Sequence, residues 1–269
     1  MELSRFMTTF IAAGDSFTWG NDLPDCDHLI PSQFTWAALL AKHFNFNYRC
    51  VAVPGGPNRS IERVCINAVE TALANNESVV VGVMWTYPHR LEYKLNERVK
   101  DNSDYYYTIS QWHTLDFEEK MELWGKVDEA RRSFVARQHE EFQQVGVTDI
   151  SIAITKHVTD DYYFAETLRS QILLRDYLTR KAVPYFYLPA CDNVVLDRIE
   201  TKDAYVKTLI ADAKTANWVP EPVRRGFVQW AMVNDYKIGF GNHPLQPAHK
   251  DYFEKYILPY VKSTVNVGV

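Results

Sequence analysis

The chain has 269 residues, 46% of them hydrophobic and 23% charged, which are ordinary values for a globular protein long enough to bury a full core. Its formal net charge of −5 excludes a nucleic acid as the main ligand, because phosphate binding needs a basic face. No apolar run approaches the roughly 18–20 residues of a membrane-spanning helix, so we expect no membrane partner. The N-terminal residues lead directly into a predicted strand and lack the pattern of a signal peptide. The four cysteines form no C-x-x-C pair, which predicts no zinc site and no disulfide framework and favours a cytoplasmic location.

The first third of the chain alternates between apolar strands and amphipathic helices. Residues 8–13 are apolar on both faces and predict a central parallel strand, and residues 48–53 and 78–84 predict two more. A helix is expected to begin at Ser32, and a second helix to begin with Asn58 as its N-cap. This order of strands and helices predicts a parallel sheet with right-handed crossovers.

The middle of the chain interrupts this alternation, and we expect a helical and aromatic insertion at about residues 87–157. Residues 101–113 are aromatic without a clear period, and residues 117–142 predict one long helix. The alternation then resumes with a helix at 160–181, a strand at 183–188, a helix at 201–216 and a closing helix at 246–261. There is no internal repeat or low-complexity linker, so residues 1–269 are expected to form a single domain that carries the insertion.

A candidate nucleophile follows the first predicted strand, where the apolar run stops at Gly14-Asp15-Ser16. In open α/β folds, ligands bind at the carboxyl ends of the strands. A serine at this edge becomes a nucleophile only if a base reaches its hydroxyl. The candidate base is His243 in Gly241-Asn242-His243-Pro244, near the other end of the chain.

Gly14-Asp15-Ser16 together with the late His243-Pro244 resembles the SGNH (GDSL) hydrolases, a family of serine esterases and lipases. The resemblance implies a three-layer α/β/α sandwich of flavodoxin-like topology with a parallel sheet of about five strands. Four of these strands are visible in the sequence, and the fifth is implied by the resemblance alone. It also implies that Ser16 and His243 are catalytic and that neither a cofactor nor a metal is needed.

An acyl-transfer site also needs hydrogen-bond donors for the oxygen that becomes negative in the tetrahedral intermediate. The family uses the N–H of the nucleophile, here Ser16, and a glycine amide that Gly55 or Gly56 would supply. Its third donor is an asparagine after the third strand, but this chain has Met84-Trp85-Thr86-Tyr87 there. We therefore expect Thr86 to donate through its hydroxyl, or Asn58 to reach in from the preceding turn.

The acid that should orient His243 is missing from its usual place. The family has Asp-x-x-His-Pro, whereas Phe240 stands three residues before His243 here. The supporting residues that we consider instead are Asp15, Asp235, Asn242 and His249, with His249 also a fallback base. The loop at residues 21–30 contains Asp22, Asp25, Asp27 and His28, and we interpret it as a solvated acidic loop rather than a metal site.

Serine ester hydrolysis is the leading functional hypothesis, with a small-molecule or carbohydrate-borne acyl ester as the substrate. Aromatic residues make up 14% of the chain, and this high share favours a lid or a groove that binds apolar groups or sugars. Candidate substrate-binding residues are Trp19, Trp85, Tyr87 and Arg90. Two alternatives stay open at this point: an acyltransferase that uses the same serine, and a non-catalytic binding or structural protein that retains the fold.

Overall fold

The computed structural model describes residues 8–26, 29–94, 106–124, 129–220 and 224–265. Its chain divides into two compact units, one made of Met1–Pro88 and Phe164–Val269 and the other of His89–Tyr163. The second unit overlaps most of the insertion expected at about residues 87–157.

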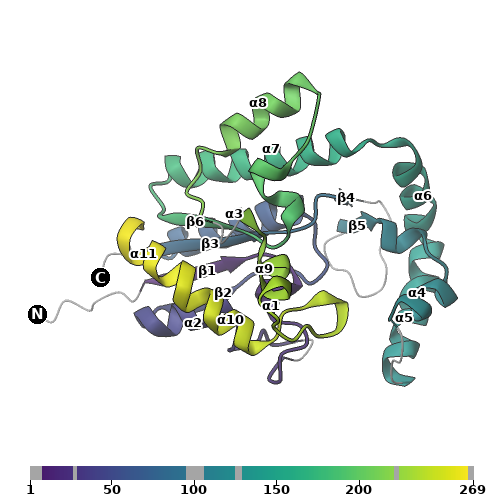
Figure 1. Ribbon diagram of the computed structural model, residues 1–269, viewed down its shortest axis with the longest axis horizontal. Helices are drawn as coiled ribbons and strands as arrows, with labels where there is room; N and C mark the ends of the chain where they lie inside the picture. The colour runs from purple at the N-terminus through teal and green to yellow at the C-terminus, as the bar shows by residue number, and fades with distance from the viewer. Residues whose placement is uncertain (1–7, 27–28, 95–105, 125–128, 221–223, 266–269) are drawn as a thin grey trace, which may run out of the picture. The chain divides into compact units, whose positions relative to one another are not determined.

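A parallel sheet of four strands forms the centre of the first unit (Figure 1). The strands are β1 (Thr9–Ala13), β2 (Asn47–Cys50), β3 (Val79–Trp85) and β6 (Tyr185–Pro189), in the order β2-β1-β3-β6. All three strand pairs are parallel, as the alternation of strands and helices predicts. The carboxyl ends of β1 and β3 therefore lie side by side at one edge of the sheet.

Helices cover both faces of this sheet, which confirms the predicted α/β/α layers. Side chains alternate along β1, so Phe10 and Ala12 pack with one layer and Ile11 and Ala13 with the other. The first layer contains helices α2 (Trp36–Phe44), α9 (Phe227–Val233), α10 (Gln246–Tyr252) and α11 (Leu258–Thr264). The second contains α3 (Asn58–Ala74) and α7 (Asp160–Arg180), which lie on the opposite side of the strands in Figure 1.

The resemblance implies a fifth strand in this sheet, but the part of the chain that the structure describes contributes only four. Its place beside β6 is taken by a single bridge between Tyr187 and Trp218. The N–H of Tyr187 donates to the carbonyl of Asn217, and the N–H of Val219 donates to the carbonyl of Tyr187, each at 2.9 Å. Pro220 follows at once and has no N–H to continue such a ladder.

Several helix boundaries differ from their predicted positions. Helix α2 begins at Trp36, with Thr35 rather than Ser32 as its N-cap. Helix α3 begins at Asn58 itself, so that Pro57 occupies the cap position and Asn58 is free for another role. Helix α8 spans Ala204–Ala213, and the closing helix is interrupted by a π-helical segment at Phe253–Ile257.

The second unit contains strands that the sequence did not reveal. Strand β4 (Arg90–Lys94) pairs antiparallel with β5 (Tyr106–Ser110), and Tyr107 and Ile109 turn their side chains into a small core. Helices α4 (Phe117–Trp124), α5 (Glu129–Gln144) and α6 (Val147–His157) complete this unit. The single long helix predicted at 117–142 corresponds to α4 and α5, and residues 125–128 between them lie outside the described residues. No helix in the described ranges is long and apolar enough to cross a membrane.

Candidate active site

Ser16 lies at the carboxyl edge of the sheet, as the first residue of the four-residue helix α1 (Ser16–Trp19) that follows β1. The carboxylate of Asp15 accepts the N–H of Phe17 at 3.1 Å and so caps this short helix. Gly20 ends the helix in the left-handed conformation, with φ +91°. The side chain of Ser16 is thereby fixed at the edge where ligands bind in open α/β folds.

The ring of His243 meets this serine from the other end of the chain. Its Nε2 lies 2.9 Å from the Oγ of Ser16. The loop that carries it is held by the N–H of Gly239, which donates to the carbonyl of His243 at 2.7 Å. Gly241 adopts φ +66°, and a Cβ there would lie 3.1 Å from the ring, so a glycine lets the loop turn closely around the imidazole.

The other ring nitrogen of His243 is bonded to Asp22, which the sequence interpretation did not consider as its partner. The distance from Nδ1 to Oδ2 of Asp22 is 2.9 Å. Asp22 follows Ser16 by six residues and adopts φ +66°, so the chain folds back immediately after α1. A Cβ on Gly239 would lie 3.0 Å from the Cβ of Asp22, so this glycine allows the histidine loop to pack on the aspartate.

At Asp22, these contacts correct the interpretation of residues 21–30 as a solvated acidic loop, whereas Asp25 is exposed. The side chains of Asp22 and His243 are only 16% and 13% exposed. Asp25 accepts bonds from the hydroxyl of Ser32 and the N–H of Gln33, which close the loop that carries Asp22. Asp27 and His28 lie outside the described residues. Within the described ranges, no group of three or more His, Cys, Asp or Glu side chains is placed to hold a metal ion.

Asp235 and Asn242, which the sequence analysis considered as partners of His243, do not fill that position. Both are exposed, and both adopt left-handed backbone conformations with φ of +57° and +64°. Asp22 occupies the Nδ1 side of the ring in their place.

His249 is buried behind the loop of His243 and is bonded on both sides. Its Nδ1 accepts the N–H of Trp36 at 3.3 Å, and its ring also bonds the carbonyl of Pro244. Burial, together with a smaller effect of the nearby His243, lowers the pKa of His249 to about 3. A neutral imidazole whose two nitrogens are engaged in this way braces the loop, and this geometry speaks against the fallback role of His249 as the base.

Asn58 and Thr86, the two candidate side-chain donors to the oxyanion, are in close contact, and their side-chain donors bond to other groups of the protein. The side-chain amide of Asn58 donates to the carbonyl of Thr86 at 2.9 Å and to the hydroxyl of Thr167 at 3.0 Å. Its oxygen accepts the N–H of Thr86 at 2.9 Å. The hydroxyl of Thr86 donates to Asp15 at 2.5 Å. These bonds contradict the expectation that Asn58 or Thr86 donates to the oxyanion.

The two candidate glycine donors, Gly55 and Gly56, differ in whether their N–H groups are already hydrogen-bonded within the protein. Gly56 donates to the carbonyl of Val53 at 2.8 Å, so its N–H is already used in a turn. The structure records no such bond for the N–H groups of Gly55 and Ser16, within the residues that it describes. Gly55 is therefore the better candidate for the glycine donor, and its role as one stays a prediction.

The four predicted substrate-binding residues have different surroundings. Trp85 is fully buried and packs against Tyr187, with ring centroids 5.2 Å apart, so it belongs to the core and not to a binding surface. Tyr87 is partly exposed and lies beside Phe17, whose ring also contacts His243. Trp19 is partly exposed at the end of α1. Arg90 begins β4 in the second unit, and its role toward substrate remains a prediction, as do those of Trp19 and Tyr87.

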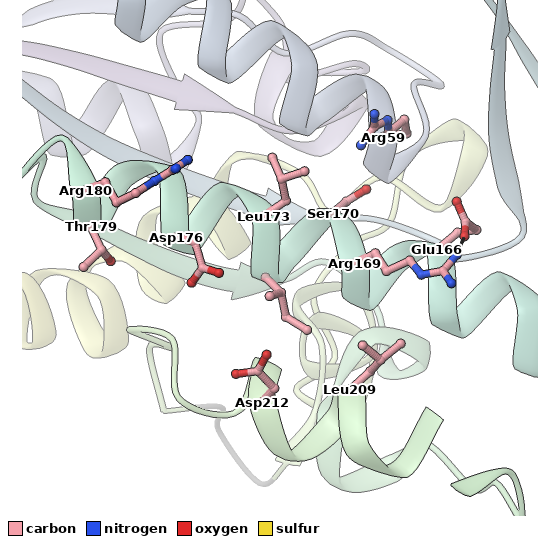
Figure 2. A pocket seen from close by; sticks show the side chains of 11 residues that line it. Arg59, Glu166, Arg169, Ser170, Leu173, Asp176, Thr179, Arg180, Leu209 and Asp212 are labelled. Carbon is pink, nitrogen blue, oxygen red and sulfur yellow. Dashed lines mark hydrogen bonds and ion pairs between the residues drawn. The ribbon is translucent and has the colours of Figure 1, made fainter. Parts of the chain in front are cut away.

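A cavity of about 900 Å³ is lined by residues of α3, α7 and α8, and none of them is a candidate site residue (Figure 2). Its lining includes three arginines and three acidic residues, so its charges balance. They are Arg59, Arg169, Arg180, Glu166, Asp176 and Asp212. Arg169 pairs with Glu166 within this set, and Arg59 pairs with Glu62. We assign no ligand to this cavity.

Comparison with known proteins gives weak structural similarities. No protein-family model matches the sequence, and no curated protein is significantly similar to it. The fold is similar to the crystal structure of TesA, with 13% identity, a TM-score of 0.44, and coverage of 95% of this chain and 98% of that one. It is also similar to a structure from Desulfitobacterium hafniense DCB-2 assigned to the lipolytic G-D-S-L family, with 12% identity, a TM-score of 0.42, and coverage of 92% and 96%.

A third similar structure is the acetyl xylan esterase Est2A from the rumen bacterium Butyrivibrio proteoclasticus. The identity is 10% and the TM-score 0.42, over 96% of this chain and 64% of that one. With TM-scores below 0.5, these similarities carry no argument about activity.

Proposed function

We propose that the protein is a serine hydrolase that cleaves a carboxylic ester through an acyl-enzyme on Ser16. The observation that carries this proposal is the continuous contact from Ser16 through His243 to Asp22, with both ring nitrogens 2.9 Å from their partners. Nucleophile, base and orienting acid in this order are the requirements of serine acyl transfer.

The protonation of the three groups follows from their contacts. Asp22 accepts a hydrogen bond from Nδ1–H of His243, which leaves Nε2 as the acceptor for the hydroxyl proton of Ser16. The carboxylate thereby fixes the tautomer that the reaction needs and stabilises the imidazolium that forms.

In the acylation step, Oγ of Ser16 attacks the ester carbonyl while its proton moves to Nε2 of His243. The tetrahedral intermediate collapses by breaking the bond to the alcohol oxygen, which leaves with the proton from Nε2. In the second step, a water molecule gives a proton to Nε2 and attacks the acyl carbon, and the bond to Oγ breaks with return of the proton to Ser16. The N–H groups of Ser16 and Gly55 are our proposed donors to the oxyanion.

For the substrate, we propose a small acyl group carried on a small molecule or a carbohydrate. Trp19 follows Ser16 by three residues, and the ring of Tyr87 lies beside that of Phe17, the residue after Ser16. Both aromatic rings are partly exposed, which supports a contact surface for an apolar group or a sugar.

The experiment that tests this function compares hydrolysis of p-nitrophenyl acetate and of an acetylated xylo-oligosaccharide by the wild type and by Ser16→Ala. We expect the wild type to turn over at least one of them and the variant to be inactive on both. Turnover that is equal in the two proteins would place the activity elsewhere and reject the proposal.

A further inference from the structure

A buried hydrogen-bond network connects the first turn of α3 to the nucleophile helix, and Asn58 lies at its centre. Asn58, Thr86 and Asp15 are at most 2% exposed, and Thr167 on α7 is 4% exposed. Buried polar groups of this kind must be satisfied by one another, because water does not reach them.

The side chain of Asn58 binds the backbone of Thr86 on both sides, as the backbone of a neighbouring strand would. It accepts the N–H of Thr86 and donates to its carbonyl, each at 2.9 Å. Thr86 directly follows β3, at the point where the strand leaves the sheet. The second amide hydrogen of Asn58 goes to Thr167, so both of its donors are used.

The fixed backbone of Thr86 in turn directs its hydroxyl at the nucleophile turn. The hydroxyl donates to Oδ2 of Asp15, whose other oxygen caps α1 at the N–H of Phe17. Ser16 is the first residue of that helix. It lies between Asp15, which accepts the hydroxyl of Thr86, and Phe17, whose N–H donates to Asp15. Since His243 approaches from a different element, a shift of α1 would lengthen the distance from Oγ to Nε2.

We infer that Asn58 is a positioning residue, which holds Ser16 in register with His243 through Thr86 and Asp15. This inference rests on the proposed function, and it gives Asn58 and Thr86 a role that needs no contact with substrate. Misplacement of a reacting group by about 1 Å can lower a rate by about a hundredfold. The network therefore acts on the chemical step and leaves substrate affinity unchanged.

The test measures kcat and KM for p-nitrophenyl acetate, together with the rate and site of fluorophosphonate labelling, well below the Tm of each variant. Thr86→Val removes the hydroxyl that reaches Asp15 and leaves the backbone groups that Asn58 binds. Asn58→Leu removes all three bonds of Asn58 at similar volume. We expect each to lower kcat by about 10- to 100-fold with KM unchanged. Thr86→Ser restores the hydroxyl and most of the rate.

Asn58 and Thr86 both act through the bond from the hydroxyl of Thr86 to Asp15. The double variant Asn58→Leu/Thr86→Val should therefore be no slower than the slower of the two single variants. Thr167→Val removes one bond of Asn58 and should give a smaller loss, whereas Thr71→Val, at an exposed site on the same helix, should match the wild type. If Asn58→Leu does not fold, the comparison of Thr86→Val with Thr86→Ser decides the question.

Variants that lower the Tm while kcat stays at the wild-type value would show a purely structural role and overturn the inference, as would fully additive losses. In both cases the wild type still labels at Ser16, so the proposed function survives. A wild type that does not label at Ser16 would overturn the proposed function and this inference together.

Discussion

Oδ2 of Asp22 lies 2.9 Å from Nδ1 of His243, although the two residues are 221 positions apart in the chain. The aspartate comes from the loop directly after the nucleophile helix, not from the residues just before the histidine. One short segment, from Asp15 to Asp22, therefore supplies the cap of the helix, the proposed nucleophile and the proposed acid.

Loss of the Asp22 carboxylate should reduce activity far more than loss of any other nearby acid. Asp22→Asn keeps the size of the side chain but no longer fixes the tautomer of His243, and we expect kcat/KM to fall by about 10⁴-fold. Asp235→Asn is the matched control, since Asp235 is exposed in the loop after α9, and it should retain wild-type activity. Steady-state assays with p-nitrophenyl acetate give both values. A larger loss in Asp235→Asn than in Asp22→Asn would restore the interpretation based on sequence.

Removal of the Ser16 hydroxyl should abolish activity with little effect on stability. Ser16 is buried, and Ser16→Ala loses one hydrogen bond, a change of about 1 kcal/mol in the free energy of unfolding. In a chain of this length that lowers the Tm by about 2–4 °C. Calorimetry and an esterase assay should be run beside Ser263→Ala, which removes an exposed hydroxyl near the C-terminus. A collapse of the Tm with activity retained would make Ser16 a structural residue.

The buried His249 should make the protein less stable in mild acid. Its pKa in the folded protein is about 3, whereas in the unfolded chain it is about 6.5. Below pH 6.5 the unfolded state therefore binds one more proton than the folded state, and stability falls by up to about 1.4 kcal/mol per pH unit until about pH 3.

The glutamine in His249→Gln does not titrate. Between pH 7 and pH 5 the free energy of unfolding of this variant should therefore fall by about 2 kcal/mol less than that of the wild type. Urea unfolding of both proteins at the two pH values measures this difference. The pKa of His113 is also low, about 4, but His113 is present in both proteins and cancels in the comparison. Equal losses in the two proteins would mean that His249 does not remain neutral in the fold.

The second unit should be cleaved before the sheet of the first unit is. Residues His89–Tyr163 form a compact unit of their own, with a small core around Leu91, Tyr107 and Val147. Brief digestion followed by mass spectrometry should therefore locate the first cuts within residues 89–163. First cuts within α3, between Ile61 and Leu73, would contradict this division of the chain.

Local patterns in the sequence were sufficient to predict the central architecture. The apolar run at 8–13 and the helical spacing after Asn58 predicted β1 and α3, because a buried strand and an amphipathic helix each have a distinctive period. Strands β4 and β5 were missed because their alternation is carried by tyrosine, threonine and charged residues with few aliphatic ones. Their pairing becomes clear only from tertiary contacts.

The site was only partly visible for a similar reason. Ser16 and His243 lie in short patterns with a fixed spacing, whereas Asp22 has none. Its contact depends on two left-handed turns, at Gly20 and at Asp22 itself, and on the room left by Gly239. The available signals were the missing acid three residues before His243 and the presence of Asp22 six residues after Ser16. The sequence predicted Asn58 as an N-cap and as a possible oxyanion donor, because its bonds to the backbone of Thr86 have no sequence signature.

The most direct test of the Ser16–His243–Asp22 arrangement is the rate of labelling by a fluorophosphonate, with the modified peptide identified by mass spectrometry. The wild type, Asp22→Asn and Asp235→Asn should be compared under one set of conditions. We predict a single phosphonate on Ser16 in the wild type and in Asp235→Asn at similar rates, and labelling of Asp22→Asn slower by about three to four orders of magnitude. An unlabelled Ser16 in the wild type, or equal rates in the wild type and Asp22→Asn, would contradict the account.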